Sequence, residues 1–567
     1  MLKRPLAIGV DDFEKIITKE YYYVDKTLLI KELLDKKGEV NLFTRPRRFG
    51  KTLNLSMLRY YFENTGDEEK NHKNADLFSG LAITDAGEKY TKEMGQYPVI
   101  MLTLKSAKQP SWELAYLMLK RQIAEEFFRH KDIIDRLPET EERYRRIMSE
   151  KAEMGSVVDS LAFLSKCLYQ AYGQKCIILI DEYDVPLENA YFTGFYDEMV
   201  GFIRSLFESA LKTNPYLEFA VITGCLRISR ESIFTGLNNL RIYSILSENY
   251  DEYFGFTEGE VLTMLKSYDR EGNIDTVKEW YDGYCFGDVE VYNPWSVINY
   301  MQDIITNPDS IPTPYWANTS SNSIVREMVE NASEEVREEL EELINGGTIE
   351  KPVHEDITYD SIHDTEDNLW NFLFFTGYLK KISSRLEEPN QIVTMAIPNT
   401  EVIYIYENTI RNWFDKKKRG LNISPLYAAI ENGDTEQMAE EVSGFLMETI
   451  SFFDYGESYY HGFLAGLLRN NGKYRVISNR EAGLGRADII LKTPRIRNGK
   501  AIIMELKTVK SYHDMEKGCE AAIKQIEEQK YREELEQEGY QDILCYGICF
   551  FRKECLVSRL LYKKSQE

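Results

Sequence analysis

The sequence predicts an α/β fold in three parts. A parallel-sheet domain is expected over residues 1–245, a helical, winged-helix-like middle over 246–430, and a compact α+β unit over 431–567. Three observations support this: apolar strands alternate with helical segments in the first part, a helix, hairpin and helix follow one another in the second, and strands followed by a charged helix occupy the third. A chain of 567 residues is also too long for one hydrophobic core.

The first part alternates short apolar runs with segments of helical periodicity. The expected strands are 39–44, 97–104, 176–180 and 217–223, and the expected helices are 111–129, 156–172 and 196–213. Strands that are connected through helices pair in parallel, and the helices cover both faces of the sheet. A phosphate-binding loop of the P-loop kind fits between the first strand and the helix after it.

The middle part is mainly helical and rich in aromatic residues. NLWNFLFFTGYLKKI, residues 368–382, predicts a buried helix that ends at Gly377 and continues into a strand. A turn at 387–390 leads into a second strand, IVTMAI, and a further helix follows. This order is typical of a winged-helix module.

The last part begins with a predicted helix at 458–469. Strands are expected at 474–480, 487–493 and 501–509, a charged helix at 514–535, and a final apolar strand at 543–551. An Asn-Gly turn is expected between the second and third of these strands. The result is a mixed sheet with helices.

Composition restricts the functional class. The formal net charge of -24 argues against a surface that binds nucleic acid throughout, although basic clusters occur at 45–51 and 416–419. Eight cysteines without a Cys-x-x-Cys pair indicate reduced core thiols rather than a zinc site. No apolar run is long enough for a membrane span, and the N-terminus lacks a signal-peptide core. We therefore expect a cytoplasmic protein.

The segment NLFTRPRRFGKT, residues 41–52, predicts a nucleotide site. Gly50, Lys51 and Thr52 match the second half of a P-loop, whose amides and lysine bind phosphate and whose hydroxyl binds Mg²⁺. Arg45 stands where the first glycine is usual, and it disfavours positive φ. Together with Arg48 it adds positive charge that attracts phosphate or, alternatively, a nucleic-acid backbone.

Acidic and polar residues at two further strand ends support this prediction. CIILIDEYD places Asp181, a candidate Mg²⁺ ligand, and Glu182, a candidate general base, after a buried strand. Thr223 ends another strand, where it can contact the terminal phosphate. Arg227 or Arg230 is either a further phosphate contact or a surface residue.

A second group of candidate residues lies near the C-terminus. Glu505 and Lys507 lie on one face of their strand, and the preceding strand can bring Asp488 beside Glu505. Two carboxylates that share a hard cation, with a lysine near the attacking water, suit a Mg²⁺-dependent phosphodiester hydrolase. Glu457 is a further candidate metal ligand, one helical turn from His461.

In combination, several motifs resemble the bacterial AAA-ATPase-like proteins that carry a C-terminal PD-(D/E)XK nuclease domain. These motifs are YVDKT, RPRRFGKT, LIDEYD, TGCLRISRESIFTGLNNL, WYDGYCFG with YNPWS, and the C-terminal ELK segment. The resemblance implies that the arginine-rich loop is a family variant of the P-loop. It also implies that Asp488, Glu505 and Lys507 form a PD-(D/E)XK centre, with Gln525 as a candidate accessory residue.

These features predict an ATP- and Mg²⁺-dependent enzyme whose nuclease module acts on nucleic acid, DNA more readily than RNA. A role in defence or in mobile DNA is an analogy, and self-association into an oligomer is a further expectation. Two alternatives stay open. One is a nucleotide-switched scaffold whose C-terminal domain only binds nucleic acid, and the other is an ATPase whose arginine-rich loop binds nucleic acid with little hydrolysis.

Overall fold

The computed structural model describes residues 3–227, 233–234, 237–317, 325, 333–355, 365–387, 390–418, 423–449, 457–468, 473–478, 487–494 and 499–560. The chain divides into two compact units. Unit 1 comprises residues 1–322 and 346–406, and unit 2 comprises residues 323–345 and 407–567. The three boundaries drawn from the sequence stay a prediction. Among the described residues, no helix combines the length and apolarity that crossing a membrane requires.

Unit 1 contains the predicted parallel sheet. Its strands are β1 (Val40–Thr44), β2 (Val99–Thr103), β3 (Cys176–Asp181), β4 (Leu217–Gly224) and β5 (Leu240–Tyr243), in the order β2-β3-β4-β1-β5. Every neighbouring pair is parallel. The sheet confirms the α/β prediction, although the sequence did not identify β5. All residues of β1 and β3 are buried, which agrees with helices covering both faces.

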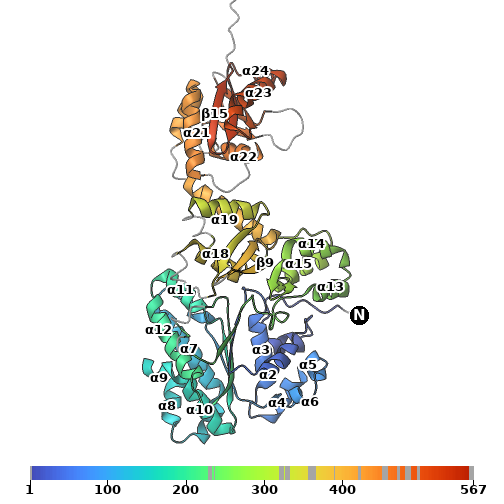
Figure 1. Cartoon of the computed structure of the whole chain (residues 1–567), viewed down its shortest axis with the longest axis vertical. Coiled ribbons are helices and arrows are strands. Elements are labelled where there is room, and N and C mark those ends of the chain that lie inside the picture. The colour runs from blue at the N-terminus through green and yellow to red at the C-terminus, as the bar shows by residue number, and fades with distance from the viewer. Residues whose placement is uncertain are drawn as a thin grey trace, which may run out of the picture. The chain divides into compact units, whose positions relative to one another are not determined.

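Helices flank this sheet on two sides (Figure 1). They are α1 (Phe13–Thr18), α2 (Leu28–Lys36), α3 (Lys51–Phe62), α4 (Glu68–Asp76), α5 (Ala82–Asp85), α6 (Glu88–Thr91), α7 (Trp112–Arg129), α8 (Glu141–Met148), α9 (Met154–Val158), α10 (Ser160–Tyr172), α11 (Val185–Thr193) and α12 (Tyr196–Leu211). In Figure 1, α2 and α3 lie on one side, and α7, α10 and α12 on the other. The predicted helices at 111–129 and 196–213 correspond to α7 and α12.

The rest of unit 1 continues with helices and short strands. These are α13 (Glu258–Ser267), α14 (Ile274–Tyr281), β6 (Tyr284–Phe286), β7 (Val289–Val291), α15 (Pro294–Thr306), β8 (Ile349–Val353), α18 (Glu366–Thr376), β9 (Lys380–Glu387), β10 (Asn390–Ala396) and α19 (Thr400–Lys418). Gly377 ends α18 with φ 91°, as predicted from the sequence. The β9–β10 hairpin lies between α18 and α19 in the chain, which is the winged-helix order, and β10 also pairs with β8 in an antiparallel sheet.

Unit 2 has a five-stranded mixed sheet in the order β11-β12-β13-β14-β15. Its elements are α17 (Glu334–Ile344), α20 (Ser424–Asn432), α21 (Thr435–Thr449), α22 (Glu457–Leu468), β11 (Arg475–Ser478), β12 (Ile489–Lys492), β13 (Lys500–Thr508), α23 (Met515–Glu528), α24 (Tyr531–Glu538), β14 (Asp542–Phe551) and β15 (Glu554–Arg559). The single charged helix predicted at 514–535 is wrong, because Lys530 adopts a left-handed φ of 54° between α23 and α24. β15 was not predicted.

A carboxyl group is buried where α15 meets α19. The fully buried Glu401 accepts hydrogen bonds from the Ser296 hydroxyl at 2.8 Å and from the Trp316 backbone amide at 2.8 Å. Burial raises the pKa of Glu401 to about 7, and these hydrogen bonds partly oppose the rise.

Replacing Glu401 with Gln should make the stability of the protein less dependent on pH. A carboxyl whose pKa is raised on folding stabilises the fold below its unfolded pKa, near 4.5, and loses that contribution as pH rises through about 7. Between pH 4.5 and pH 8, we expect the free energy of unfolding of the wild type to fall by on the order of 3 kcal/mol more than that of Glu401→Gln. Urea unfolding at several pH values measures this difference. Parallel curves for the two proteins would contradict it.

Candidate functional site

The loop between β1 and α3 has the backbone of a phosphate site. Gly50 precedes α3 with φ 81°, and no heavy atom of the described residues other than its chain neighbours and the backbone of its own helix lies within 4 Å of the position that a Cβ would take. In the part of the chain that the structure describes, the N-cap Gly50 provides no side-chain cap for α3, which begins at Lys51. Free amides and the helix dipole at such an N-terminus favour an anion. The glycine is therefore required by its backbone conformation, and the space beside it is open.

Three polar side chains from distant parts of the chain meet beside this loop. The Asp181 carboxylate accepts one hydrogen bond from the Thr52 hydroxyl at 2.7 Å and another from the Thr223 hydroxyl at 2.5 Å. Asp181 and Thr223 are buried. In the sheet order, β4 separates β1 from β3, so the loop between β1 and α3 has to pass the end of β4 to bring Thr52 to the end of β3. This geometry places a hydroxyl and a carboxylate, both hard oxygen donors, where Mg²⁺ can bind.

Lys51 is buried against its own loop. Its Nζ donates hydrogen bonds of 2.8 Å to the carbonyls of Arg45 and Pro46, and it lies 3.6 Å from the sulfur of Cys225. The ammonium is thus held at the loop. In this position its positive charge lies at the loop where phosphate would bind.

Glu182 follows Asp181 with a left-handed φ of 53°. This conformation is uncommon for a residue with a side chain and often accompanies a functional site. The side chain is half-buried and lines a cavity next to the loop. Burial, followed by the negative charge of Asp181, raises the pKa of Glu182. A raised pKa suits a group that accepts a proton near neutral pH.

Arg45 is placed differently from the expectation that it faces phosphate. Its side chain is fully buried, and its guanidinium donates hydrogen bonds to the carbonyls of Thr44 at 2.9 Å and Tyr243 at 2.7 Å. It also lies 5.2 Å and 5.0 Å from the ring centres of Phe254 and Phe286. Burial lowers the pKa of Arg45 to about 9. Arg45 therefore fixes the loop from the side of the core, and Arg48 is the residue with positive φ, at 72°.

Removing the Arg45 side chain should destabilise unit 1 rather than weaken phosphate binding directly. Arg45→Ala would leave buried carbonyls without donors and create a cavity. We therefore expect the free energy of unfolding to fall by about 3 to 5 kcal/mol. Chemical denaturation measures the loss. Arg146→Ala, at an exposed position of α8, is the matched control and should change stability little. A stable Arg45→Ala protein with greatly weakened ATP binding would contradict this structural role.

The other arginines also have partners. Arg47 forms an ion pair with Glu188 of α11, and Arg227 pairs with Glu355 at 2.9 Å. Arg227 is thus engaged by Glu355, whereas Arg230 lies outside the described residues.

The carboxylate of Asp184 has a structural role that the sequence did not reveal. It accepts hydrogen bonds from the backbone amides of Cys225 at 2.6 Å and Leu226 at 3.1 Å. It therefore fixes the turn that directly follows Thr223. The sequence signal that could have indicated this role is that Asp184 is the third carboxylate of the DEYD motif.

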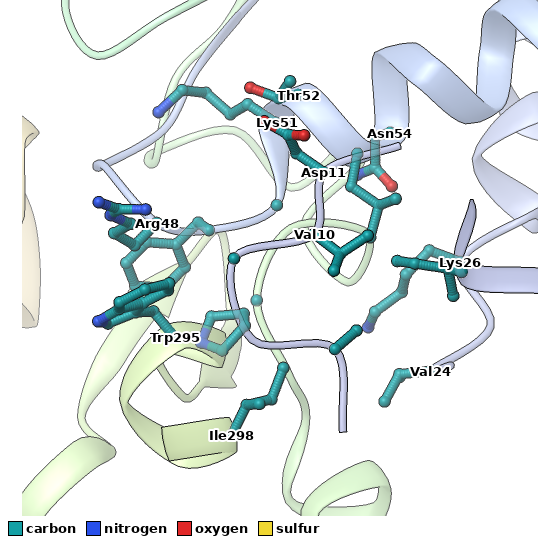
Figure 2. Close-up of a pocket in the computed structure, with 18 of the residues that line it drawn as sticks. Val10, Asp11, Val24, Lys26, Arg48, Lys51, Thr52, Asn54, Trp295 and Ile298 are labelled. Carbon is teal, nitrogen blue, oxygen red and sulfur yellow. The ribbon is translucent and has the colours of Figure 1, made fainter. Parts of the chain in front are cut away.

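A cavity of about 360 Å³ opens beside the loop (Figure 2). The P-loop residues 47–54 line one side, and Glu182 lies among them. The N-terminal segment 6–11, residues 22–26 and α15 supply mostly apolar side chains around the rest. Figure 2 shows Val10, Val24 and Ile298 around the same space as Lys51 and Thr52. An apolar cavity next to a phosphate-binding loop is suited to a nucleotide.

In unit 2, the predicted acidic pair is brought together. Ile489 of β12 pairs with Met504 of β13, and the preceding residue, Asp488, lies opposite Glu505. The Asp488 amide approaches the Glu505 carboxylate at 3.4 Å, and the Asp488 carboxylate accepts from the Leu506 amide at 2.8 Å. Burial, followed by the charge of Asp488, raises the pKa of Glu505 to about 7. Like charges held this close favour a bound cation.

Two further side chains border this pair. Lys507 Nζ lies 3.4 Å from the Glu505 carboxylate, on the same face of β13. The ring of His461 contacts the backbone carbonyl of Asp488 at 2.8 Å and is buried. His461 thus positions the strand. Glu457 begins α22, but its side chain lies outside the part that the structure describes.

Gln525 and Tyr531 come from the two helices after β13. The Gln525 side chain forms a hydrogen bond with the Tyr531 hydroxyl. Burial raises the pKa of Tyr531, and the negative charges of Glu505 and Asp488 raise it further. The negative charge of the acidic pair thus reaches Tyr531. Within the described ranges, no group of three or more His, Cys, Asp or Glu side chains converges as a metal site.

The sheet order, the P-loop and the paired carboxylates together define a P-loop ATPase-like unit linked to a nuclease-like fold. Comparison with known families agrees. Residues 7–234 match the model described as "Predicted AAA-ATPase", and residues 455–559 match that of the PD-(D/E)XK nuclease superfamily. The chain is therefore an AAA-ATPase-like protein with a C-terminal PD-(D/E)XK nuclease superfamily domain.

A curated relative is also similar. An "uncharacterized protein in vnfD 5'region" of Azotobacter chroococcum mcd 1 is 27% identical over 340 residues, which are 58% of this chain and 57% of the relative. The chain thus matches just over half of that relative's length. No solved structure matches the chain.

Proposed function

We propose that unit 1 binds and hydrolyses ATP with Mg²⁺. The observation that carries this proposal is the convergence of Thr52 and Thr223 on the Asp181 carboxylate. Thr52 and Asp181 would hold the cation, and Lys51 with the amides after Gly50 would hold phosphate. When bound, Mg²⁺ neutralises charge on the phosphates. Glu182 would accept a proton from the attacking water, and Thr223 would orient the terminal phosphate.

We propose further that unit 2 cleaves DNA with a divalent cation. Asp488 and Glu505 supply the carboxylates, and Lys507 lies where it can orient or activate water. The acidic overall charge restricts contact with nucleic acid to local surfaces. ATP bound to unit 1 would control this cleavage in the cytoplasm, and defence against foreign DNA is the biological role that we favour. Self-association of the chain stays part of this proposal.

The purified chain should be assayed with ATP, Mg²⁺ or Mn²⁺, and single- and double-stranded DNA and RNA. ATP turnover together with cation-dependent cleavage that is sensitive to EDTA supports the proposal. Tight ATP binding without cleavage of any substrate would favour a nucleotide-switched scaffold. Absence of both ATP binding and cleavage would contradict the proposal.

A further inference from the structure

One P-loop side chain at the edge of the cavity, Arg48, rests on an aromatic ring. The guanidinium carbon of Arg48 lies 4.3 Å from the ring centre of Trp295, and Figure 2 shows the two groups together at the cavity. This distance is that of a close cation–π contact. Arg48 holds a left-handed φ of 72°, which a residue with a Cβ rarely adopts. The loop is thus shaped so that this arginine rests on an aromatic ring contributed by another element.

The Arg48 guanidinium is also close to negative charge. The charges of Glu182 and Asp11 act on it, and both residues line the cavity. A bound triphosphate would bring more negative charge into the same space. Arginine forms paired, charge-assisted hydrogen bonds with phosphate oxygens, which are stronger than a contact with an aromatic face. Phosphate and Trp295 would therefore compete for Arg48.

Trp295 is linked to the start of α19 through one neighbour. It lies in the first turn of α15, where the Asn293 side chain accepts from the amides of both Trp295 and Ser296. The Ser296 hydroxyl donates to the buried Glu401 carboxylate at 2.8 Å. Glu401 is the second residue of α19, and this helix begins in unit 1 and continues into unit 2. A short series of contacts thus connects the P-loop to the helix that leads out of unit 1.

We propose that the Arg48–Trp295 contact senses nucleotide: bound phosphate draws Arg48 from Trp295, and the freed α15 alters the Ser296–Glu401 contact at the start of α19. This inference rests on the proposed binding of ATP by unit 1. It gives Trp295 a positioning role, in which the ring restrains Arg48 while the site is empty. Hydrolysis and phosphate release would let Arg48 return to the ring.

ATP affinity separates this role from a structural one. Trp295→Leu removes the group that competes with phosphate, so we expect ATP to bind about fivefold more tightly. A ring that only supports the fold, or that contacts the nucleotide itself, would give weaker binding. Arg48→Met removes the phosphate contact and should weaken ATP binding. Trp280→Phe, at a partly buried tryptophan of α14, is the control and should leave ATP affinity unchanged.

Hydrogen exchange and fluorescence of the full chain test the transmission step. In the wild type, ATP should change the rate of amide exchange of residues 294–306 and 400–409. In Ser296→Ala, the change at 400–409 should be lost, and the affinity for ATP should stay the same. The ATP-dependent change in tryptophan emission should be lost in Trp295→Phe, which keeps an aromatic ring, and adenosine should not produce it in wild type.

Calorimetry of ATP binding distinguishes the two ways in which these ideas can fail. If ATP binds but neither the emission nor the exchange of α15 and α19 changes, the sensor is wrong and the proposed ATP site stands. If calorimetry detects no ATP binding, both the site and the sensor are wrong.

Discussion

Asp181→Asn should lower ATP turnover by about 100-fold or more while leaving unit 1 folded. The carboxylate is the meeting point of Thr52 and Thr223, and the neutral amide is a much poorer Mg²⁺ ligand. Folding should persist because the amide oxygen can still accept from one threonine hydroxyl. The other hydroxyl can rotate to accept from the amide NH₂. Steady-state phosphate release measures the effect.

Asp197→Asn makes the same chemical change at an exposed position of α12 and serves as the control. It should retain wild-type turnover. Urea unfolding of Asp181→Asn should show that the fold is intact. If Asp181→Asn hydrolysed ATP at the wild-type rate, the cation site assigned to Thr52 and Asp181 would be wrong.

Glu505→Gln should reduce cation-dependent DNA cleavage by about 100-fold or more and leave ATP turnover by unit 1 in place. The variant removes one of the two carboxylates that can share a cation, next to Asp488 and Lys507. It should not disturb the fold, because burial raises the pKa of Glu505 to about 7 and glutamine resembles the protonated acid. Cleavage of a labelled duplex in Mg²⁺ or Mn²⁺ measures the loss.

Glu520→Gln, at an exposed position on α23 of the same unit, is the matched control and should cleave as wild type does. Equal cleavage by Glu505→Gln and Glu520→Gln would show that the acidic pair is not the nuclease centre. Loss of cleavage in both variants would indicate damage to the fold of unit 2.

The regular elements were the most predictable part of this protein. Apolar runs such as CIILI and AVIT are buried on both faces of a parallel sheet, and this environment leaves a continuous apolar pattern in the sequence. Gly377 ends its helix as expected because a left-handed position favours glycine. The break at Lys530 was missed because lysine in a charged helical run carries no such signal.

The candidate sites were predictable to the extent that they lie at strand ends. Thr52, Asp181 and Thr223 meet because the carboxyl ends of parallel strands share one edge. The orientation of Arg45 was not predictable from the sequence. An arginine at the first glycine position of a P-loop is expected to bind phosphate, and only the tertiary structure shows its buried aromatic surroundings. For the same reason, the pairing of Arg48 with Trp295 depends on tertiary contacts across a long sequence separation.

We propose that each chain holds two separate cation sites, one at Asp181 and one at Glu505. Mn²⁺ binding, followed by electron paramagnetic resonance in the presence of a non-hydrolysable ATP analogue, is the decisive measurement. We predict two bound ions per wild-type chain, with one lost in Asp181→Asn and the other in Glu505→Gln. An unchanged stoichiometry in either variant would contradict the assignment of that site.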